Sequence, residues 1–217
     1  MFYLAKSPWL LRKLYPDCIW EIPTEEKVIY LTFDDGPNPK ATYFVLDELK
    51  RYNARATFFC IGKNVEENHE TYKQILFEGH KVGNHTYDHL NGWKTPDKEY
   101  LANIEKASTV IDSHLFRPPY GRITKFQLKA IQNKKFELKT VMWSVLSGDF
   151  DTSIKPENCY LNVVKNAKEG SIIVFHDSEK AFPNLRIALP KTLEYFAAKG
   201  FTFKSISTIA DKKIGPG

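Results

Sequence analysis

The chain has 217 residues, of which 42% are hydrophobic and 26% are charged, and its 31 Lys+Arg against 26 Asp+Glu give a formal net charge of +5. This balance is typical of a globular domain and excludes an intrinsically disordered chain. No apolar run approaches the roughly 20 residues that a transmembrane helix needs, and the basic residues are too scattered to predict nucleic-acid binding.

After a start that we expect to be irregular, at 1–26, the pattern alternates between strands and helices. Short β-branched and aromatic runs predict strands at 28–33, 56–61, 81–84, 115–117, 137–145, 171–175 and 201–206. Apolar residues near a 3.6 spacing predict helices at 42–52, 65–77, 97–113, 124–134, 155–168 and 185–199. Strands that are separated by helices indicate a parallel sheet with right-handed crossovers. Their number favours a single-domain α/β fold, a distorted (β/α)7-type barrel.

The cysteines and the N-terminus carry little functional signal. Cys18, Cys60 and Cys159 are far apart and form no CxxC pair, so we expect thiols rather than a zinc site or a disulfide framework. No signal peptide is visible at the start of the sequence, which predicts a cytoplasmic protein. The sequence does not indicate an oligomeric state.

Two polar clusters follow predicted strands, and the catalytic residues of such barrels lie at the carboxyl ends of strands. Asp34 and Asp35 end the first strand before Gly36 and Pro37. A routine turn would explain this run, but adjacent carboxylates repel each other, and a metal held by one of them would relieve the repulsion. The second cluster is 85–89, whose two histidines are four apart. We expect both on one side of a helical turn, with zinc-ligand spacing, and a pair of surface histidines is the alternative.

Three further clusters follow later strands. The run 117–121, Arg-Pro-Pro-Tyr-Gly, predicts a rigid turn whose arginine could orient a carboxylate, or else a structural proline-rich loop. The run 143–150 ends in Asp149 and Phe150 and says little by itself. His176 closes an apolar strand, where it is either a structural residue or a general acid, because the pKa of histidine is easily tuned near neutrality.

With all five clusters in this order, the chain resembles the polysaccharide deacetylase family, the NodB homology domain of carbohydrate esterase family 4, from about 28 to 206. The resemblance implies a catalytic domain at 27–210, with 1–26 packed on the barrel and a C-terminal tail at 211–217. It also implies that Asp34 is the general base, and that Asp35, His85 and His89 hold a divalent metal. Zinc suits these ligands best, and cobalt, nickel or manganese could occupy the same site.

The resemblance assigns the remaining roles residue by residue. Arg117 orients the base, the backbone N–H of Tyr120 faces the oxyanion, His176 is the general acid and Asp149 tunes it. The positions that it assigns to substrate binding are Phe150, Val174, Pro119 and Trp143. The fourth motif departs from the family in two places, because Leu146 stands where an acidic residue is common and Phe150 where tryptophan is common.

The resemblance therefore implies a metal-dependent deacetylase that acts on a carbohydrate containing N-acetylglucosamine, such as peptidoglycan or a chitin-like polymer. Two alternatives stay open. The enzyme could cut another amide or an O-acetyl ester such as acetylxylan. The chain could also be a catalytically silent carbohydrate-binding relative, although such a module has no need of the complete set of acidic and histidine residues.

Overall fold

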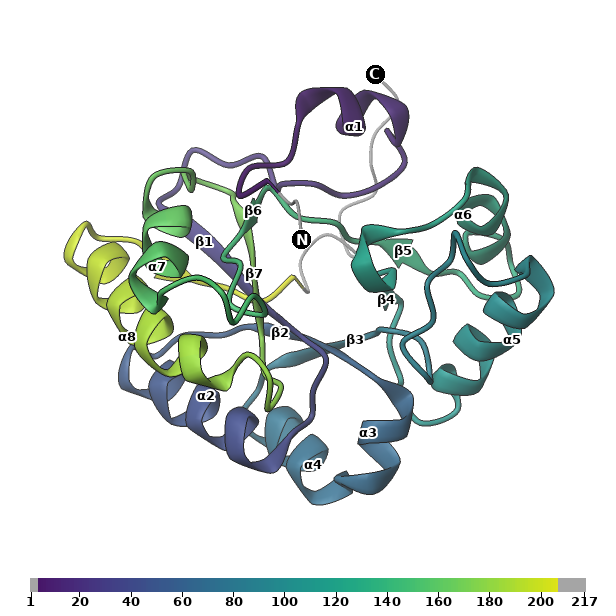
Figure 1. Ribbon diagram of the computed structural model, residues 1–217, viewed down its shortest axis with the longest axis horizontal. Helices are drawn as coiled ribbons and strands as arrows, with labels where there is room; N and C mark the ends of the chain where they lie inside the picture. Colours follow the sequence, from purple (N-terminus) through teal and green to yellow (C-terminus); the bar gives the residue numbers. More distant parts are fainter. Residues whose placement is uncertain (1–3, 207–217) are drawn as a thin grey trace.

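A curled sheet runs through the centre of the molecule and helices surround it in the computed structural model, which describes residues 4–206 (Figure 1). The strands are β1 (Val28–Asp34), β2 (Thr57–Cys60), β3 (Lys81–Asn84), β4 (Leu115–Phe116), β5 (Lys139–Thr140), β6 (Val145–Leu146), β7 (Ile172–His176) and β8 (Thr202–Phe203). Their order is β5-β4-β3-β2-β1-β7-β6, with β8 beside the start of β1, and every pair is parallel. The predicted α/β class and distorted barrel are confirmed.

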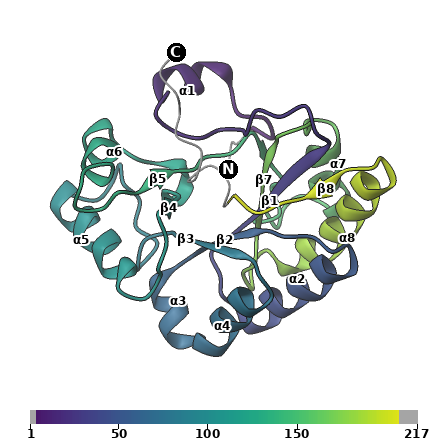
Figure 2. The ribbon, with the colours of Figure 1, turned by 180° about the vertical axis from the view of Figure 1, so that it is seen from behind.

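The helices lie outside the sheet, and Figure 2 shows the same arrangement from behind. They are α1 (Trp9–Leu14), α2 (Pro39–Arg51), α3 (Gly62–Glu67), α4 (His69–Phe77), α5 (Asp97–Ser108), the 3-10 turn η1 (Pro119–Gly121), α6 (Lys125–Ile131), α7 (Pro156–Val164) and α8 (Phe182–Ala198). The single helix predicted at 65–77 is wrong, because the chain breaks at Asn68. The side-chain amide of Asn68 donates to the carbonyls of Asn64 and Pro37, so the break is tied to the loop after β1. Within the described residues, no helix is long and apolar enough to cross a membrane.

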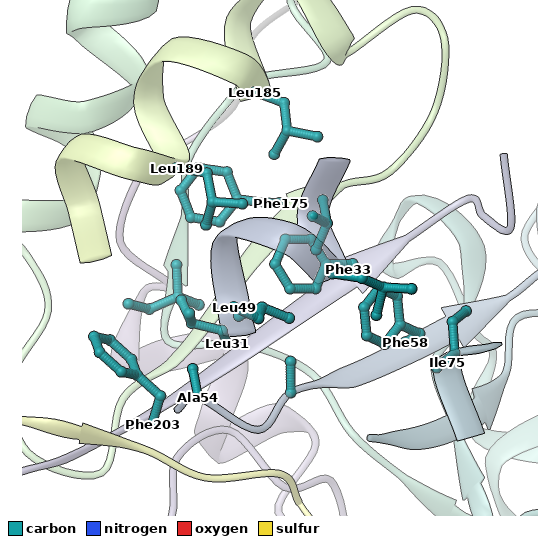
Figure 3. Packing of buried hydrophobic residues seen from close by; sticks show 14 of the residues in the cluster. Leu31, Phe33, Leu49, Ala54, Phe58, Ile75, Phe175, Leu185, Leu189 and Phe203 are labelled. Atoms are coloured by element: carbon teal, nitrogen blue, oxygen red, sulfur yellow. The ribbon is translucent and has the colours of Figure 1, made fainter. Parts of the chain in front are cut away.

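The main hydrophobic core fills the space between the sheet and the helices (Figure 3). Phe33 stacks on Phe58 with ring centroids 5.0 Å apart, and Phe175 lies 6.2 Å from Phe33 on the other side. Leu185 and Leu189 of α8 cover these rings. Because side chains alternate along a strand, Phe33 and Phe175 point toward the helices while their neighbours in sequence point into the barrel. This alternation turns the ends of β1 and β7 toward one interior site.

One bent segment closes the barrel. The strand predicted at 137–145 is instead β5 and β6, which lie at opposite edges of the sheet although only four residues separate them. Val141 N–H still bonds to β4, whereas Ser144 N–H already bonds to Ile172 of β7. The carbonyls of Val141 and Met142 are taken by the Arg117 guanidinium, so they cannot continue a regular ladder.

The N-terminal segment lies across this bent segment and is more ordered than expected. It contains α1 and three isolated bridges, Lys6 with Val145, Ile19 with Val141 and Glu21 with Ser171. The strand predicted at 201–206 shortens to β8. The predicted tail at 211–217 and the predicted domain end at 210 lie outside the described residues.

Candidate active site

Asp34 ends β1 and is held by one arginine. Its side chain faces the barrel interior, on the same side of the strand as Thr32, and it is buried. The Arg117 guanidinium donates from Nη1 to Asp34 Oδ1 over 2.6 Å and to Thr32 Oγ1 over 2.8 Å. Arg117 is fully buried, and its guanidinium lies 4.0 Å from the centroid of the Phe59 ring. Burial lowers the pKa of Arg117, and the neighbouring carboxylate opposes that shift. The arginine therefore fixes the orientation of the Asp34 carboxylate.

Asp35 points elsewhere because the backbone turns sharply between the two carboxylates. Its φ of 76° lies in the left-handed region, which is rare for residues other than glycine. The side-chain amide of Asn64 donates to the Asp35 carbonyl over 2.8 Å, which holds the turn. The two adjacent carboxylates can therefore have different partners.

His85 and His89 converge on the Asp35 carboxylate. Asp35 Oδ1 lies 3.6 Å from His85 Nε2 and 3.1 Å from His89 Nε2, and the three ligand atoms all lie within 4.8 Å of one another. The predicted helical turn is wrong, because 85–89 is a loop with positive φ at Thr86 and His89. The histidines meet through this loop and not through helical periodicity.

The atoms in this cluster fit a divalent cation. His85 Nδ1 lies 2.7 Å from the Arg117 carbonyl, which can only accept, so Nδ1 carries the proton and Nε2 offers a lone pair toward Asp35. Asp35 Oδ1 is buried and receives no hydrogen bond. Burial raises the pKa of Asp35, but the contacts with His85 and His89 outweigh burial and hold it well below its ordinary range. A carboxylate oxygen and two imidazole nitrogens that converge on one position form a donor set that zinc prefers.

His176 and Asp149 form the other half of the site. Asp34 and His176 are register partners on β1 and β7. Asp149 is buried, and its Oδ1 lies 2.7 Å from His176 Nδ1 while its Oδ2 accepts from the His176 N–H over 2.8 Å. Burial lowers the pKa of His176, but the charge and hydrogen bond of Asp149, with the charges of Asp35 and Asp34, raise it to about 9. The imidazole therefore carries a proton at neutral pH.

The other predicted residues lie around these groups. The Phe150 ring packs edge-on to His176 with centroids 5.1 Å apart, and Val174 is buried on the face of β7 that also carries His176. The Tyr120 ring lies 4.6 Å from the His89 ring, and Tyr120 itself has a φ of 60°. Three further positions lie nearby. Pro119 is buried in η1, Trp143 lies 5.8 Å from the Arg117 guanidinium, and Leu146 is buried beside Val174.

Sequence reasoning missed Asp177. This buried residue follows His176, and its Oδ2 accepts from Thr42 Oγ1 over 2.5 Å while its Oδ1 receives no hydrogen bond. Its carboxyl lies against Gly36, where an added Cβ would come 2.1 Å from Oδ2. Burial raises the pKa of Asp177 to about 8. The signal in the sequence was an aspartate directly after His176, the histidine that ends a strand.

Comparisons with known proteins give a consistent relationship. The family model described as Polysaccharide deacetylase matches residues 21–138. The chain is 37% identical to a peptidoglycan-N-acetylglucosamine deacetylase of Bacillus cereus over 88% of this chain and 91% of that protein. It is 35% identical to the chitooligosaccharide deacetylase of Azorhizobium caulinodans, over 72% of this chain and 76% of that protein.

A solved structure matches the fold as well. The crystal structure of a peptidoglycan N-acetylglucosamine deacetylase in complex with 4-naphthalen-1-yl-N-oxidanyl-benzamide superimposes with a TM-score of 0.83. The match covers 92% of this chain and 95% of the other chain, at 32% sequence identity.

Proposed function

Because the chain belongs to the polysaccharide deacetylase family, we propose that it removes N-acetyl groups from N-acetylglucosamine residues of a poly- or oligosaccharide, releasing acetate. The observation that carries the proposal is the meeting of Asp35, His85 and His89 beside two oriented pairs, the buried Arg117–Asp34 and the partly buried Asp149–His176. Relatives that are named for peptidoglycan and for chitooligosaccharides support this class of substrate.

Asp35, His85 and His89 would hold the metal, with zinc as the best match to one carboxylate and two imidazoles. A divalent cation bound there would polarise the acetyl carbonyl and acidify a water molecule. Cobalt, nickel and manganese also accept such ligands, and the metal in the cell depends on availability as well as affinity.

Asp34 is proposed to take the proton of the attacking water. Arg117 binds its Oδ1, so Oδ2 is the oxygen that accepts the proton. A buried and fixed carboxylate suits this role, because a general base must be held within hydrogen-bond reach of the proton that it removes.

His176 is proposed to protonate the leaving amine. Its pKa of about 9 keeps it in the acid form at neutral pH, and Asp149 fixes which nitrogen faces the substrate because it binds Nδ1. Transfer of the proton from Nε2 to the leaving nitrogen would release the amino sugar without a covalent intermediate.

The turn at η1 is proposed to stabilise the oxyanion. Its internal hydrogen bonds use the N–H groups of Gly121 and Arg122, which bond to Pro118 and Pro119. The N–H of Tyr120 is the proposed donor to the developing oxyanion, and removal of one such donor in comparable sites costs roughly 3–4 kcal/mol. Val174 and Phe150 would line the pocket for the acetyl methyl group.

The experiment is acetate release by metal-stripped and zinc- or cobalt-restored protein. The panel contains chitooligosaccharides, peptidoglycan fragments and acetylated xylan. Metal-dependent acetate from the glucosamine substrates supports the proposal, whereas release from acetylxylan alone favours the O-acetyl ester alternative. Silence on the whole panel with metal bound directs the search to other amides, and silence without metal binding favours a carbohydrate-binding relative.

A further inference from the structure

An arginine stacked on a tryptophan stands beside the site and has no role in the proposed mechanism. The Arg122 guanidinium carbon lies 4.1 Å from the centroid of the Trp93 ring. Arg122 is exposed, and Trp93 keeps 55% of its surface accessible. A large aromatic side chain left this open on a rigid loop is available to a ligand.

The backbone holds the Trp93–Arg122 pair in place. Trp93 Nε1 donates to the carbonyl of Ile123 over 3.0 Å. Gly92 allows the two loops to approach, because an added Cβ there would lie 2.5 Å from the Arg122 carbonyl oxygen. Gln127 Nε2 donates to the Gly92 carbonyl over 2.8 Å. The tryptophan ring, and with it the support for the arginine, is therefore fixed before any ligand arrives.

The pair is close to the reacting groups. Trp93 follows the ligand His89 by four residues, and Arg122 follows Tyr120 by two, while the rings of His89 and Tyr120 are 4.6 Å apart. Four residues of chain span at most roughly 14 Å. A substituent on the reacting sugar, or on its neighbour, is therefore within reach of the arginine.

Arg122 lacks an acidic partner. Between residues 4 and 206, Arg12, Arg51 and Arg117 each pair with a carboxylate, whereas none pairs with Arg55, Arg122 or Arg186. Among these three described arginines, only Arg122 stacks on a tryptophan. A guanidinium presents a fork of N–H donors that matches a carboxylate bidentately, and stacking on an aromatic ring leaves the edge of that fork open. The pair therefore leaves guanidinium N–H donors free to bind a carboxylate of a ligand.

We propose that Arg122, supported by Trp93, binds a carboxylate of the substrate, so that the enzyme prefers N-acetylated saccharides bearing carboxylate groups, as peptidoglycan does, over neutral chitooligosaccharides. This inference rests on the proposed deacetylase function and narrows its substrate class. The chemistry recognised is a carboxylate next to the N-acetyl sugar.

The test compares one peptidoglycan fragment with the same fragment after its carboxylates are amidated, using the metal-loaded enzyme. Arg122→Gln should lower kcat/KM for the anionic fragment about tenfold or more, since hydrogen bonds to charged groups are the stronger ones. The amidated fragment should change less than about twofold, and Arg122→Lys should recover part of the preference. Lys125→Gln, which removes an exposed cation three residues away, is the matched control and should leave the preference intact.

Trp93→Ala should weaken the preference mainly through KM, because the arginine loses its support. Equal losses on both fragments in Arg122→Gln, or an unchanged preference, would overturn the proposal. If the wild-type enzyme releases acetate from neither fragment and from no chitooligosaccharide, the proposed function fails. Calorimetric binding of the two fragments to wild-type and Arg122→Gln protein then still decides whether the arginine selects the carboxylate.

Discussion

Arg117 Nη1 lies 2.6 Å from Asp34 Oδ1, and both side chains are buried. The same guanidinium is inaccessible to solvent and donates to the carbonyls of Val141 and Met142. The backbone carbonyl of Arg117 faces His85 Nδ1. One residue thus contacts the proposed base, a proposed metal ligand and the segment that closes the barrel, so its loss should affect stability and activity together.

We expect Arg117→Ala to destabilise the fold by about 3–5 kcal/mol, because it leaves the Asp34 carboxylate buried without its partner. Urea unfolding monitored by circular dichroism measures this change. Lys73→Ala removes a lysine from the exposed pair with Glu70 and should cost less than about 1 kcal/mol. An equal, small cost for both variants would show that the buried pair does not support the fold.

Asp35→Asn and His89→Ala should each lose bound metal and activity together, since each removes a ligand from a three-residue set. Elemental analysis after dialysis against zinc measures the stoichiometry. Asp34→Asn is the control, with metal retained and kcat reduced about 10²–10⁴-fold, as expected for loss of a general base. Full metal content in Asp35→Asn and His89→Ala would refute the ligand assignment.

The pH dependence of kcat should show a fall as pH rises through the pKa of His176, which is about 9. Turnover requires the bound cation, which offsets the charge of Asp35, one of the groups that raise this pKa, so the fall in kcat should lie below pH 9. Asp149→Asn removes the larger cause of the raised pKa and should shift the fall further toward neutrality. An alkaline limb that stays in place in Asp149→Asn would argue against His176 as the acid.

The same shift has a consequence for stability. Because the pKa of His176 is raised from 6.5, its pairing with Asp149 stabilises the fold fully below about pH 6.5. That contribution is lost as pH rises from 6.5 through 9. His176→Gln should therefore flatten this part of the stability profile, which thermal unfolding at several pH values measures.

Asp177 should act in the opposite sense from an ordinary surface carboxylate. Burial raises its pKa from 3.8 to about 8, so folding favours the protonated form and stability falls as pH rises from about 4 to 8. Asp177→Asn keeps the shape and the Thr42 contact without a charge. The gain in stability of this variant over the wild type should therefore be larger at pH 8 than at pH 5. A stability difference that does not vary between these pH values would contradict the buried, neutral carboxyl.

Periodicity predicted the alternation of elements because apolar side chains repeat every two or 3.6 residues when one face is buried. That pattern located Asp34, Asp35 and His176 at strand ends, and the structure places them together. The resemblance to a family added Arg117 and Asp149, whose partners lie far away in sequence. Their roles in catalysis stay predictions.

The errors arose where distant residues decide local structure. The loop at 85–89 depends on positive φ at Thr86 and His89, and neither residue type predicts such a conformation. The strand at 137–145 bends because its carbonyls bind Arg117. Arg117 lies outside the nine residues 137–145, so the pattern of that segment alone could not predict the bend.

The closure of the barrel also sets the order in which the protein can assemble. Ser7 Oγ donates to the Trp143 carbonyl across 136 positions of sequence, and Lys6 pairs with Val145. A ribosome releases roughly 5–20 residues per second, so Lys6 and Ser7 wait on the order of ten seconds for these partners to emerge. Contacts over such separations also slow folding, since a long loop must close before they form. The segment around Lys6 and Ser7 is therefore among the last to reach its native place, although it is made long before its partners, and until then the edges of β5 and β6 are open to other chains.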